Sequence, residues 1–427
     1  MEPPRSPSHA DDAGPEVGAI VARLPLRVTD HERDTAPAGF EALMRRCYPT
    51  EHEIETILAR KLAHRQSPRQ VPPDLAAMTD YLHAFLSQVV VGDFEISDQR
   101  WFAGGASKIQ MGFTLRWRPD SAAVESTKLV VRMEPAESLN STSRAREFEL
   151  LQAFRGVLPV PRPYWVDADG ASFPEPALIY AFADGVTKPR QTKSGTLSGI
   201  GTQFGPDLRG KLGPQFVKHL ATIHRLDVSG FTFASFDHPS VGTTQSALWQ
   251  LNRARRVWDE DRGIDLPVVE VAAGWLERNL PKLDLVSVVH GDYRSGNFLF
   301  DEASSEITSV LDWERGYLGD RHRDLAWTAS RVFGCLAEDG KTFLASGLVP
   351  IEQFFEDYER ASGLSVDAER LRYYTVFNAY QVAVAAIATG YRVVHLAKSH
   401  QDILLASTEA VGYGALEMLR RTLEELL

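Results

Sequence analysis

The chain has 427 residues and a formal net charge of −11, with 44% apolar and 24% charged residues. This composition is typical of a globular protein, and the length allows two or three domains or one large domain with insertions. The acidic balance, without any basic block, argues against binding to nucleic acid. Two cysteines, Cys47 and Cys335, are too few for a disulfide framework or a cysteine zinc site, so we expect a reducing, cytoplasmic setting.

The N-terminal part of the chain divides into two predicted segments. Residues 1–35 are rich in Pro, Asp, Ser and Ala, which predicts disorder, and they lack the apolar core of a signal peptide. Residues 36–93 form a predicted helical extension, because apolar side chains recur with helical spacing from about residue 50. The most apolar late segment, Tyr380–Leu396, is shorter than a membrane span and contains Gln381 and Arg392, so no association with a membrane is expected.

The rest of the chain predicts a small β-rich lobe followed by a larger helical lobe. Residues 94–183 contain strand-like segments, interrupted by one helical pattern at about 142–155. Residues 185 to about 214 are rich in Gly, Thr and Lys and predict a long loop. Helical patterns then fill about 214–281 and 321–427, within a predicted second lobe of residues 184–427. The expected fold class is therefore α+β.

The stretch VVHGDYRSGNFLF (Val288–Phe300) places polar groups within an apolar run. A buried carboxylate costs several kcal/mol unless it is paired, so Asp292 needs a reason to be there. The following segment, Phe298–Trp313, reads as a β-hairpin that brings Asn297 and Asp312 side by side. Their oxygen atoms are the ligands that Mg²⁺ prefers, and Asp292 would face metal-bound phosphates, where it could accept a proton. Structural turn and cap residues are the alternative interpretation.

Three motifs in order carry a resemblance to a known family. HGDYRSGN (290–297) followed by LDWE (311–314) resembles the catalytic and metal loops of aminoglycoside phosphotransferase-type kinases, small-molecule relatives of protein kinases. GDRHRDLAW (319–327) is similar to the next signature of that family, in which Asp324 would support the catalytic loop. The resemblance implies a bilobal protein-kinase-like fold with ATP and Mg²⁺ between the lobes.

The same resemblance assigns a role to each residue of the motif. Asp292 would be the catalytic base, and Asn297 and Asp312 would be Mg²⁺ ligands. Arg294 stands where protein kinases have a phosphate-contacting lysine, so it could neutralise the transferring γ-phosphate. His290 would hold the shape of the loop.

Upstream, the resemblance implies a phosphate-covering loop and a strand that meets adenine. AGGASK contains Gly104, Gly105 and Ser107 between two strand patterns, and its backbone N–H groups could cradle phosphates. A simple hairpin turn is the alternative. The segment PALIYAFADG is similar to the strand that connects the lobes, with its backbone near Tyr180 to Phe182 facing adenine.

The family also has a cation on the third strand, paired with a glutamate. Arg132 in LVVR occupies the place of the usual lysine, and arginine can contact both phosphate and carboxylate. Glu147 shares a helical face with Leu150, whereas Glu149 points nearly the opposite way, so Glu147 is the expected partner. The alternative is an exposed strand cation and a helix-surface acid.

The stretch WQLNRARRVWDEDRG most resembles kinase domains associated with acyl-CoA dehydrogenases, which implies a hydroxyacyl-CoA or a related catabolic hydroxyl compound as substrate. Arg253, Arg255 and Arg256 in this stretch favour an anionic substrate, and ordinary surface positions are the alternative interpretation. An aminoglycoside or macrolide phosphotransferase is the main alternative, followed by a nucleotide-binding pseudokinase and, last, a phosphate-ester hydrolase. The motif GIGTQFG (199–205) is interpreted as a flexible loop on the substrate side. The sequence does not indicate an oligomeric state.

Overall fold

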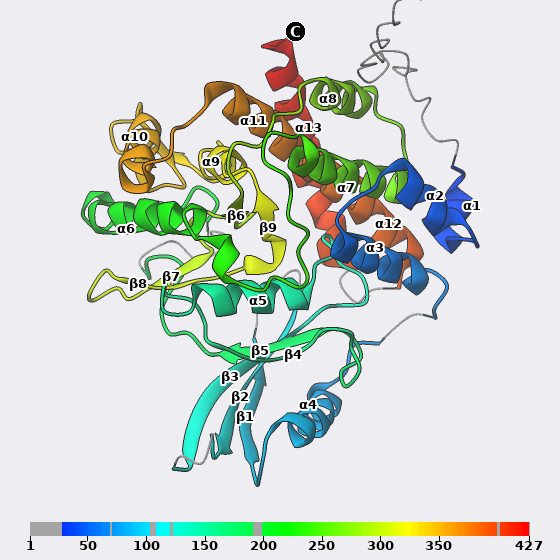
Figure 1. Cartoon of the computed structure of the whole chain (residues 1–427), viewed down its shortest axis with the longest axis vertical. Coiled ribbons are helices and arrows are strands. Elements are labelled where there is room, and N and C mark those ends of the chain that lie inside the picture. Colours follow the sequence, from blue (N-terminus) through cyan, green and yellow to red (C-terminus); the bar gives the residue numbers. More distant parts are fainter. Residues whose placement is uncertain are drawn as a thin grey trace, which may run out of the picture.

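The computed structural model describes residues 28–68, 71–102, 108–119, 123–190, 199–398 and 402–426. The chain forms two lobes, a small one built on a β-sheet and a larger one made mostly of helices (Figure 1). This is the α+β architecture that the sequence predicts. No helix in the described ranges is both long and apolar enough to cross a membrane.

A five-stranded antiparallel sheet with the order β1-β2-β3-β5-β4 forms the small lobe. Its strands are β1 (Glu95–Trp101), β2 (Ile109–Trp117), β3 (Glu125–Met133), β4 (Pro163–Asp167) and β5 (Ala177–Ala181). The sequence indicates all of them except β4, which has no regular alternation and begins at a proline. Proline is tolerated there because β4 lies at the edge of the sheet and Pro163 is its first residue.

Alternation along β3 separates the two faces of the sheet. Leu129, Val131 and Met133 pack into an apolar cluster with helix α4 (Leu75–Val89). Arg132 points to the opposite face, where helix α5 (Arg144–Phe154) lies. The period of two therefore puts one charged side chain between the sheet and the larger lobe.

The larger lobe contains two apolar cores. Its α-helices are α6 (Pro206–His224), α7 (Gln245–Asp261), α8 (Pro267–Arg278), α9 (His322–Thr328), α10 (Ile351–Ser362), α11 (Ala368–Val384), α12 (Gly390–Leu396) and α13 (Asp402–Glu424). Two 3-10 helices, η2 (Val228–Gly230) and η3 (Trp313–Arg315), and a π-helical segment, η4 (Ala385–Thr389), complete the lobe. One core includes α5, α6, the catalytic loop and α10, and the other joins α7, α8, α11 and α13. The predicted loop to residue 214 is wrong in its last part, because α6 begins at Pro206. Proline suits the first turn of a helix, where its missing N–H has no intrahelical partner.

Short strands build the segment around the motif. They are β6 (Ser287–Val289), β7 (Phe298–Phe300), β8 (Ile307–Val310), β9 (Tyr317–Gly319), β10 (Cys335–Leu336), β11 (Phe343–Ala345) and β12 (Val349–Pro350). Strands β7 and β8 form the predicted hairpin. The prediction of helix throughout 321–427 is wrong at β10–β12, where Gly340 and Gly347 have positive φ angles of 67° and 72° and end any helical run.

The N-terminal helices divide between the two lobes. Helices α1 (Asp30–Thr35), α2 (Phe40–Cys47) and α3 (His52–His64) lie along the helical lobe, whereas α4 covers the sheet (Figure 1). Buried ion pairs fix the first group. The pairs are Arg256 with Glu55, Lys61 with Asp261, and Arg392 with Asp34. The first two pairs require close geometry because both charges are largely removed from water, whereas Asp34 is 27% exposed.

Candidate active site

The catalytic loop begins directly after β6 and is held by Asp324 of α9. The Asp324 carboxylate accepts hydrogen bonds from the backbone N–H of His290 at 2.7 Å and of Gly291 at 2.8 Å. Burial favours the neutral acid, but hydrogen bonds from His224 and the nearby His290 outweigh it, and they lower the pKa of Asp324. The contacts match the loop-supporting position expected for Asp324.

His290 connects this loop to the segment that follows β8. Its Nδ1 atom accepts from the Asp292 N–H at 3.2 Å, so Nε2 carries the proton and donates to the Leu311 carbonyl at 2.9 Å. Burial lowers the pKa of His290, although Asp324 and Asp292 act in the opposite direction. A neutral imidazole therefore fixes the spacing between the catalytic loop and the hairpin.

The Asp292 side chain is oriented by three donors. One carboxylate oxygen accepts from Trp327 Nε1 at 2.7 Å and from Arg294 Nε at 3.0 Å. The other accepts from Asn297 Nδ2 at 2.8 Å. The side chain is 16% exposed, so the carboxylate is largely desolvated but open on one side. Trp327 was not singled out from the sequence, although it closes the GDRHRDLAW motif.

The hairpin places Asn297 and Asp312 at its open end. The Leu311 N–H donates to the Asn297 carbonyl at 2.8 Å, and Phe298 pairs with Val310. Asn297 Nδ2 donates to the backbone carbonyl and to the carboxylate of Asp292. The amide oxygen Oδ1 of Asn297 therefore remains available as a ligand. Asp312 has a left-handed backbone, with φ of 62°, and its side chain is 39% exposed.

These two residues fit Mg²⁺ by their chemistry. An amide oxygen and a carboxylate are hard ligands, and Mg²⁺ usually takes one or two protein oxygens together with water and phosphate oxygens. The described residues contain no cluster of three or more His, Cys, Asp or Glu side chains that could hold a metal by themselves. A magnesium ion held at Asn297 and Asp312 would therefore need phosphate oxygens to complete its shell.

Arg132 contacts the predicted glutamate and two further acids. Its guanidinium lies 3.2 Å from Glu147, 2.8 Å from Asp312 and 2.6 Å from Glu314. Burial alone would lower the pKa of Arg132, but these carboxylates raise it well above the ordinary value. The helical-face argument thus identified the correct glutamate, since Glu149 instead accepts from Ser235.

The sequence did not reveal how many charges surround this pair. Lys108 lies 2.7 Å from Glu134 and 3.7 Å from Glu314, and Arg144 pairs with Glu134, Glu147 and Glu314. Although burial opposes it, Lys108, Arg132 and Arg144 lower the pKa of Glu314 to about 2. The only signal was Glu314 itself, next to the metal motif. This buried network fixes β3, α5 and the metal loop relative to one another.

Arg294 lies beside the candidate base. Besides its bond to Asp292, its guanidinium carbon is 5.1 Å from the centre of the Phe333 ring. Gly199 of the GIGTQFG motif packs against the same loop, because a Cβ atom there would overlap the Ser295 carbonyl and the Arg294 guanidinium. The substrate-side loop therefore contacts the catalytic loop directly.

The nucleotide side of the site is described in part. Gly104, Gly105 and Ser107 lie outside the described residues. Tyr180 and Phe182 lie on and just after β5, and burial raises the pKa of Tyr180 to about 12. The backbone N–H groups of Ala181 and Phe182 donate to the carbonyls of Arg162 and Lys128. An adenine ring bound at this strand would therefore form hydrogen bonds with other backbone groups.

Phe102 was also missed from the sequence. Its ring stacks on Phe182 with the centroids 5.7 Å apart, at the point where the chain enters the Gly-rich segment. Gly112 makes room for it, because a Cβ atom there would meet the Phe102 ring at 2.6 Å. An aromatic residue just before a Gly-rich turn is the signal that could have identified it.

Comparison with known proteins places this geometry in a family. Residues 113–374, more than half of the chain, match the phosphotransferase enzyme family. Acyl-CoA dehydrogenase family member 10 of Mus musculus is 24% identical over 268 residues, which cover 60% of this chain and 24% of that protein. Acyl-CoA dehydrogenase family member 11 of Homo sapiens is 22% identical over 308 residues, which cover 70% and 38%. The match thus corresponds to well under half the length of either relative.

A solved structure from Ralstonia eutropha, with a provisional assignment as an aminoglycoside phosphotransferase, has the same fold. Its TM-score is 0.57 at 21% identity, and the match covers 81% of this chain and 98% of that one. At this identity the likeness establishes the bilobal kinase-like fold alone. The chain belongs to the phosphotransferase enzyme family, because the family match spans residues 113–374.

Proposed function

We propose that the chain transfers the γ-phosphate of ATP to a hydroxyl group of a small molecule. One observation carries this proposal. The Asp292 carboxylate is oriented by Trp327 and Asn297, and the Asn297 amide oxygen is a hard ligand beside it. Asp312, one oxygen of which pairs with Arg132, stands at the same end of the hairpin as Asn297. A base and a cation site at adjacent positions are what phosphoryl transfer to an alcohol requires.

In this proposal the protein side chains position charge and move one proton. Asp292 accepts the proton of the substrate hydroxyl as that oxygen bonds to the γ-phosphorus, and the bond to the bridging oxygen of ADP breaks. Arg132 and Arg294 stabilise the negative charge that spreads over the γ-phosphate oxygens. Bound Mg²⁺, held by Asn297 and Asp312, would supply further neutralisation of the phosphates. The buried network around Glu314 keeps Arg132 in place.

For the acceptor, we propose a hydroxyacyl-CoA or a related hydroxylated catabolic intermediate. The relatives named for acyl-CoA dehydrogenases support this choice. An aminoglycoside or macrolide is the alternative, but a cationic antibiotic needs carboxylates on the substrate side. A pseudokinase is the alternative of another class. It rests on Arg132 in place of lysine, and the intact set of Asp292, Asn297 and Asp312 argues against it.

The test is MgATP-dependent phosphorylation of a panel of alcohols by the full chain, read as ADP release and as phosphorylated product. The panel contains 3- and 4-hydroxyacyl-CoAs, simple alcohols, choline and aminoglycosides. Asp292→Asn should reduce turnover by about 10²-fold or more, because it removes the proton acceptor but keeps the shape. Asp301→Asn, an exposed change in the turn of the same hairpin, serves as the control. Full turnover by Asp292→Asn would exclude this assignment of the base.

A further inference from the structure

Three arginines near the site make no ion pair within the described residues. Arg253 of α7 donates to the Ser141 carbonyl at 2.7 Å. Arg315 of η3 and Arg323 of α9 both donate to Oε1 of Gln381, at 2.8 and 2.5 Å. Elsewhere buried arginines of this chain face carboxylates, which is the usual way to offset the loss of water. These three are satisfied only by neutral oxygens and by aromatic rings.

The neighbours of Arg253 on the same helix show the contrast. Arg255 pairs with Glu277 at 2.9 Å, and Arg256 pairs with Glu260 at 2.6 Å and with Glu55. The positive charges of Arg255 and Arg256 are therefore neutralised by carboxylates of the protein itself. Of the three arginines on α7, Arg253 is the one that makes no ion pair within the described residues.

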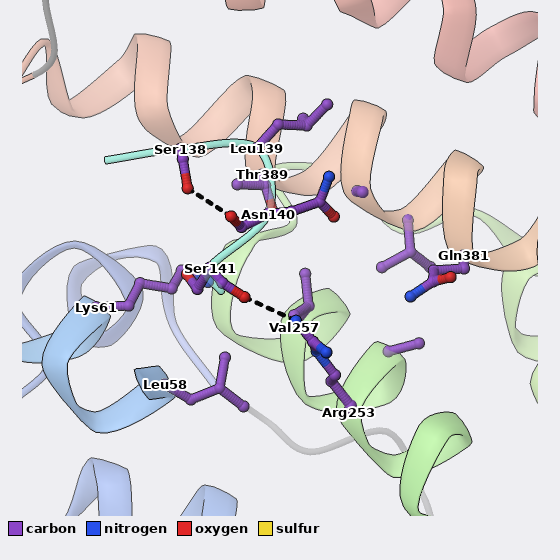
Figure 2. Close-up of a pocket in the computed structure, with 13 residues that line it drawn as sticks. Leu58, Lys61, Ser138, Leu139, Asn140, Ser141, Arg253, Val257, Gln381 and Thr389 are labelled. Carbon is purple, nitrogen blue, oxygen red and sulfur yellow. Dashed lines mark hydrogen bonds between the residues drawn. The ribbon is translucent and has the colours of Figure 1, made fainter. Parts of the chain in front are cut away.

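A pocket lies between α3, the segment before α5, α7 and α11, and Arg253 and Gln381 point into it (Figure 2). Because arginine only donates, the two bonds to Arg315 and Arg323 fix the Gln381 carbonyl away from the pocket and leave its amide nitrogen facing Arg253. Asn140 lines the same space. Among the described residues that line it there is no Asp or Glu, and one lysine, Lys61, already pairs with Asp261 at 2.6 Å.

The charge in this region is poorly compensated. Burial, together with Arg146 and Arg315, lowers the pKa of Arg253 to about 9. Burial and Arg323 likewise lower the pKa of Arg315 to about 10. A cation whose charge is disfavoured in this way gains from a bound anion, since the anion supplies the missing opposite charge.

This region also reaches the candidate base. The Arg315 guanidinium carbon lies 4.9 Å from the centre of the Trp327 ring, and the indole N–H of Trp327 donates to Asp292 at 2.7 Å. One aromatic side chain therefore separates Arg315, which holds the Gln381 side chain at the pocket, from the carboxylate that would accept the proton.

We propose that Arg253 and Gln381, which line the pocket, form a subsite for an anionic group, a phosphate or a carboxylate, on the acceptor whose hydroxyl lies at Asp292, with Arg315 behind Gln381 adding positive charge. This inference rests on the proposed function and adds to it the charge of the substrate. A guanidinium and an amide N–H suit phosphate and carboxylate oxygens equally. The subsite disfavours cationic acceptors.

Binding is measured first, without catalysis, on the full chain saturated with MgADP. The probes are 3-hydroxybutyrate, 1,3-butanediol and 3-hydroxybutyryl-CoA, observed by ligand NMR at constant ionic strength. The first two share a secondary hydroxyl and differ only in the carboxylate, and the third carries phosphates instead. At least one anionic probe should bind about tenfold or more tightly than the diol. Preference for the first or the third probe distinguishes a carboxylate from a phosphate.

Three variants decide whether the arginines cause that preference. Arg253→Gln should abolish the tighter binding of the anionic probe, and Arg253→Lys should keep part of it. The control Arg255→Gln should leave the preference for the anionic probe unchanged. Gln381→Glu guards against simple misfolding, because a glutamate there can pair with Arg315 and Arg323. This variant should melt no lower than the wild type and yet lose the anionic ligand.

The outcomes separate the two proposals. Equal binding of the anionic and neutral probes, or a preference that survives Arg253→Gln, overturns the subsite even if phosphoryl transfer occurs. Loss of the preference in Arg253→Gln, without any MgATP turnover on the alcohol panel, supports the subsite and rejects the kinase function. With turnover present, KM for the anionic acceptor should rise about tenfold in Arg253→Gln while KM for MgATP stays constant.

Discussion

The side-chain amide of Asn297 donates to both the backbone carbonyl and the carboxylate of Asp292, at 2.9 and 2.8 Å. One side chain thus orients the candidate base with its nitrogen and leaves its oxygen for a cation. This dual use explains why an asparagine, rather than an aspartate, suits the position. A second carboxylate beside Asp292 would repel it.

Replacing Asn297 with Ala should therefore impair both the orientation of Asp292 and the binding of Mg²⁺. We expect the Mg²⁺ concentration for half-maximal turnover to rise by about 10- to 100-fold, because one ligand is lost, together with a lower kcat. Titration of Mg²⁺ at saturating ATP measures both. Asn279→Ala, at the end of α8, is the matched control. An unchanged Mg²⁺ requirement in Asn297→Ala would remove this residue from the metal site.

Trp327→Phe keeps an aromatic ring beneath Arg315 but removes the N–H that donates to Asp292. We expect kcat to fall by about tenfold, since a hydrogen bond to a charged group contributes about 1.5–3 kcal/mol. KM for ATP should stay near the wild-type value. Trp258→Phe removes a comparable N–H bond, to Glu270 at 3.1 Å, away from the site. Equal kinetics in the two variants would show that the Trp327 bond does not serve catalysis.

Gly199→Ala tests the contact between the substrate-side loop and the catalytic loop. Gly199 has a φ of 75°, and a Cβ atom would overlap the Ser295 carbonyl, so the loops must separate. Gly340 has a similar φ of 67° but nothing within 4 Å, so Gly340→Ala incurs only the backbone strain, about 1–2 kcal/mol. We expect a clearly larger loss of unfolding free energy, and a loss of kcat, only in Gly199→Ala. Chemical denaturation measures the unfolding free energy and steady-state kinetics measures kcat. Equal losses of both quantities in the two variants would contradict the contact between the loops.

Acidification should destabilise the catalytic loop. Burial lowers the pKa of His224 and of His290, and hydrogen bonds outweigh burial to lower the pKa of Asp324. A group with a depressed pKa in the folded state stabilises the fold above its unfolded pKa, and that stability is lost as the pH falls towards the folded value. For the two histidines, the loss begins near the usual histidine pKa of about 6.5.

His224→Gln provides the check, because glutamine can still bond to Tyr358 or Asp324 but does not titrate. The free energy of unfolding between pH 7.5 and pH 5 should decline less steeply in the variant than in the wild type. Parallel curves for the two proteins would show that His224 has no part in the acid sensitivity.

Local patterns identified much of this site. The hairpin brought Asn297 and Asp312 to one end because a short polar turn joins two apolar strands. Helical geometry selected Glu147 over Glu149. A hairpin and a helix are both set by residues close together in the chain, so these two features do not depend on the packing of distant elements.

Contacts between distant elements could not be found in the same way. Arg253, Arg255 and Arg256 look alike in the sequence, and their difference depends on Glu55 and Glu277, which come from other helices. Trp327 reaches Asp292 only because α9 packs beside the catalytic loop. Tertiary packing, rather than periodicity, decides which polar groups acquire partners.

The division of the N-terminal helices between the two lobes has a mechanical consequence. The chain passes from the helical lobe to the sheet between α3 and α4, and returns after β5. Two covalent links restrict any swivelling of one lobe about a single connection, and the ion pairs of Arg132 and Arg144 with Glu314 oppose separation of the lobes. Cleavage of the link between α3 and α4 would leave one covalent connection, so these ion pairs would then carry a larger share of the alignment of the lobes.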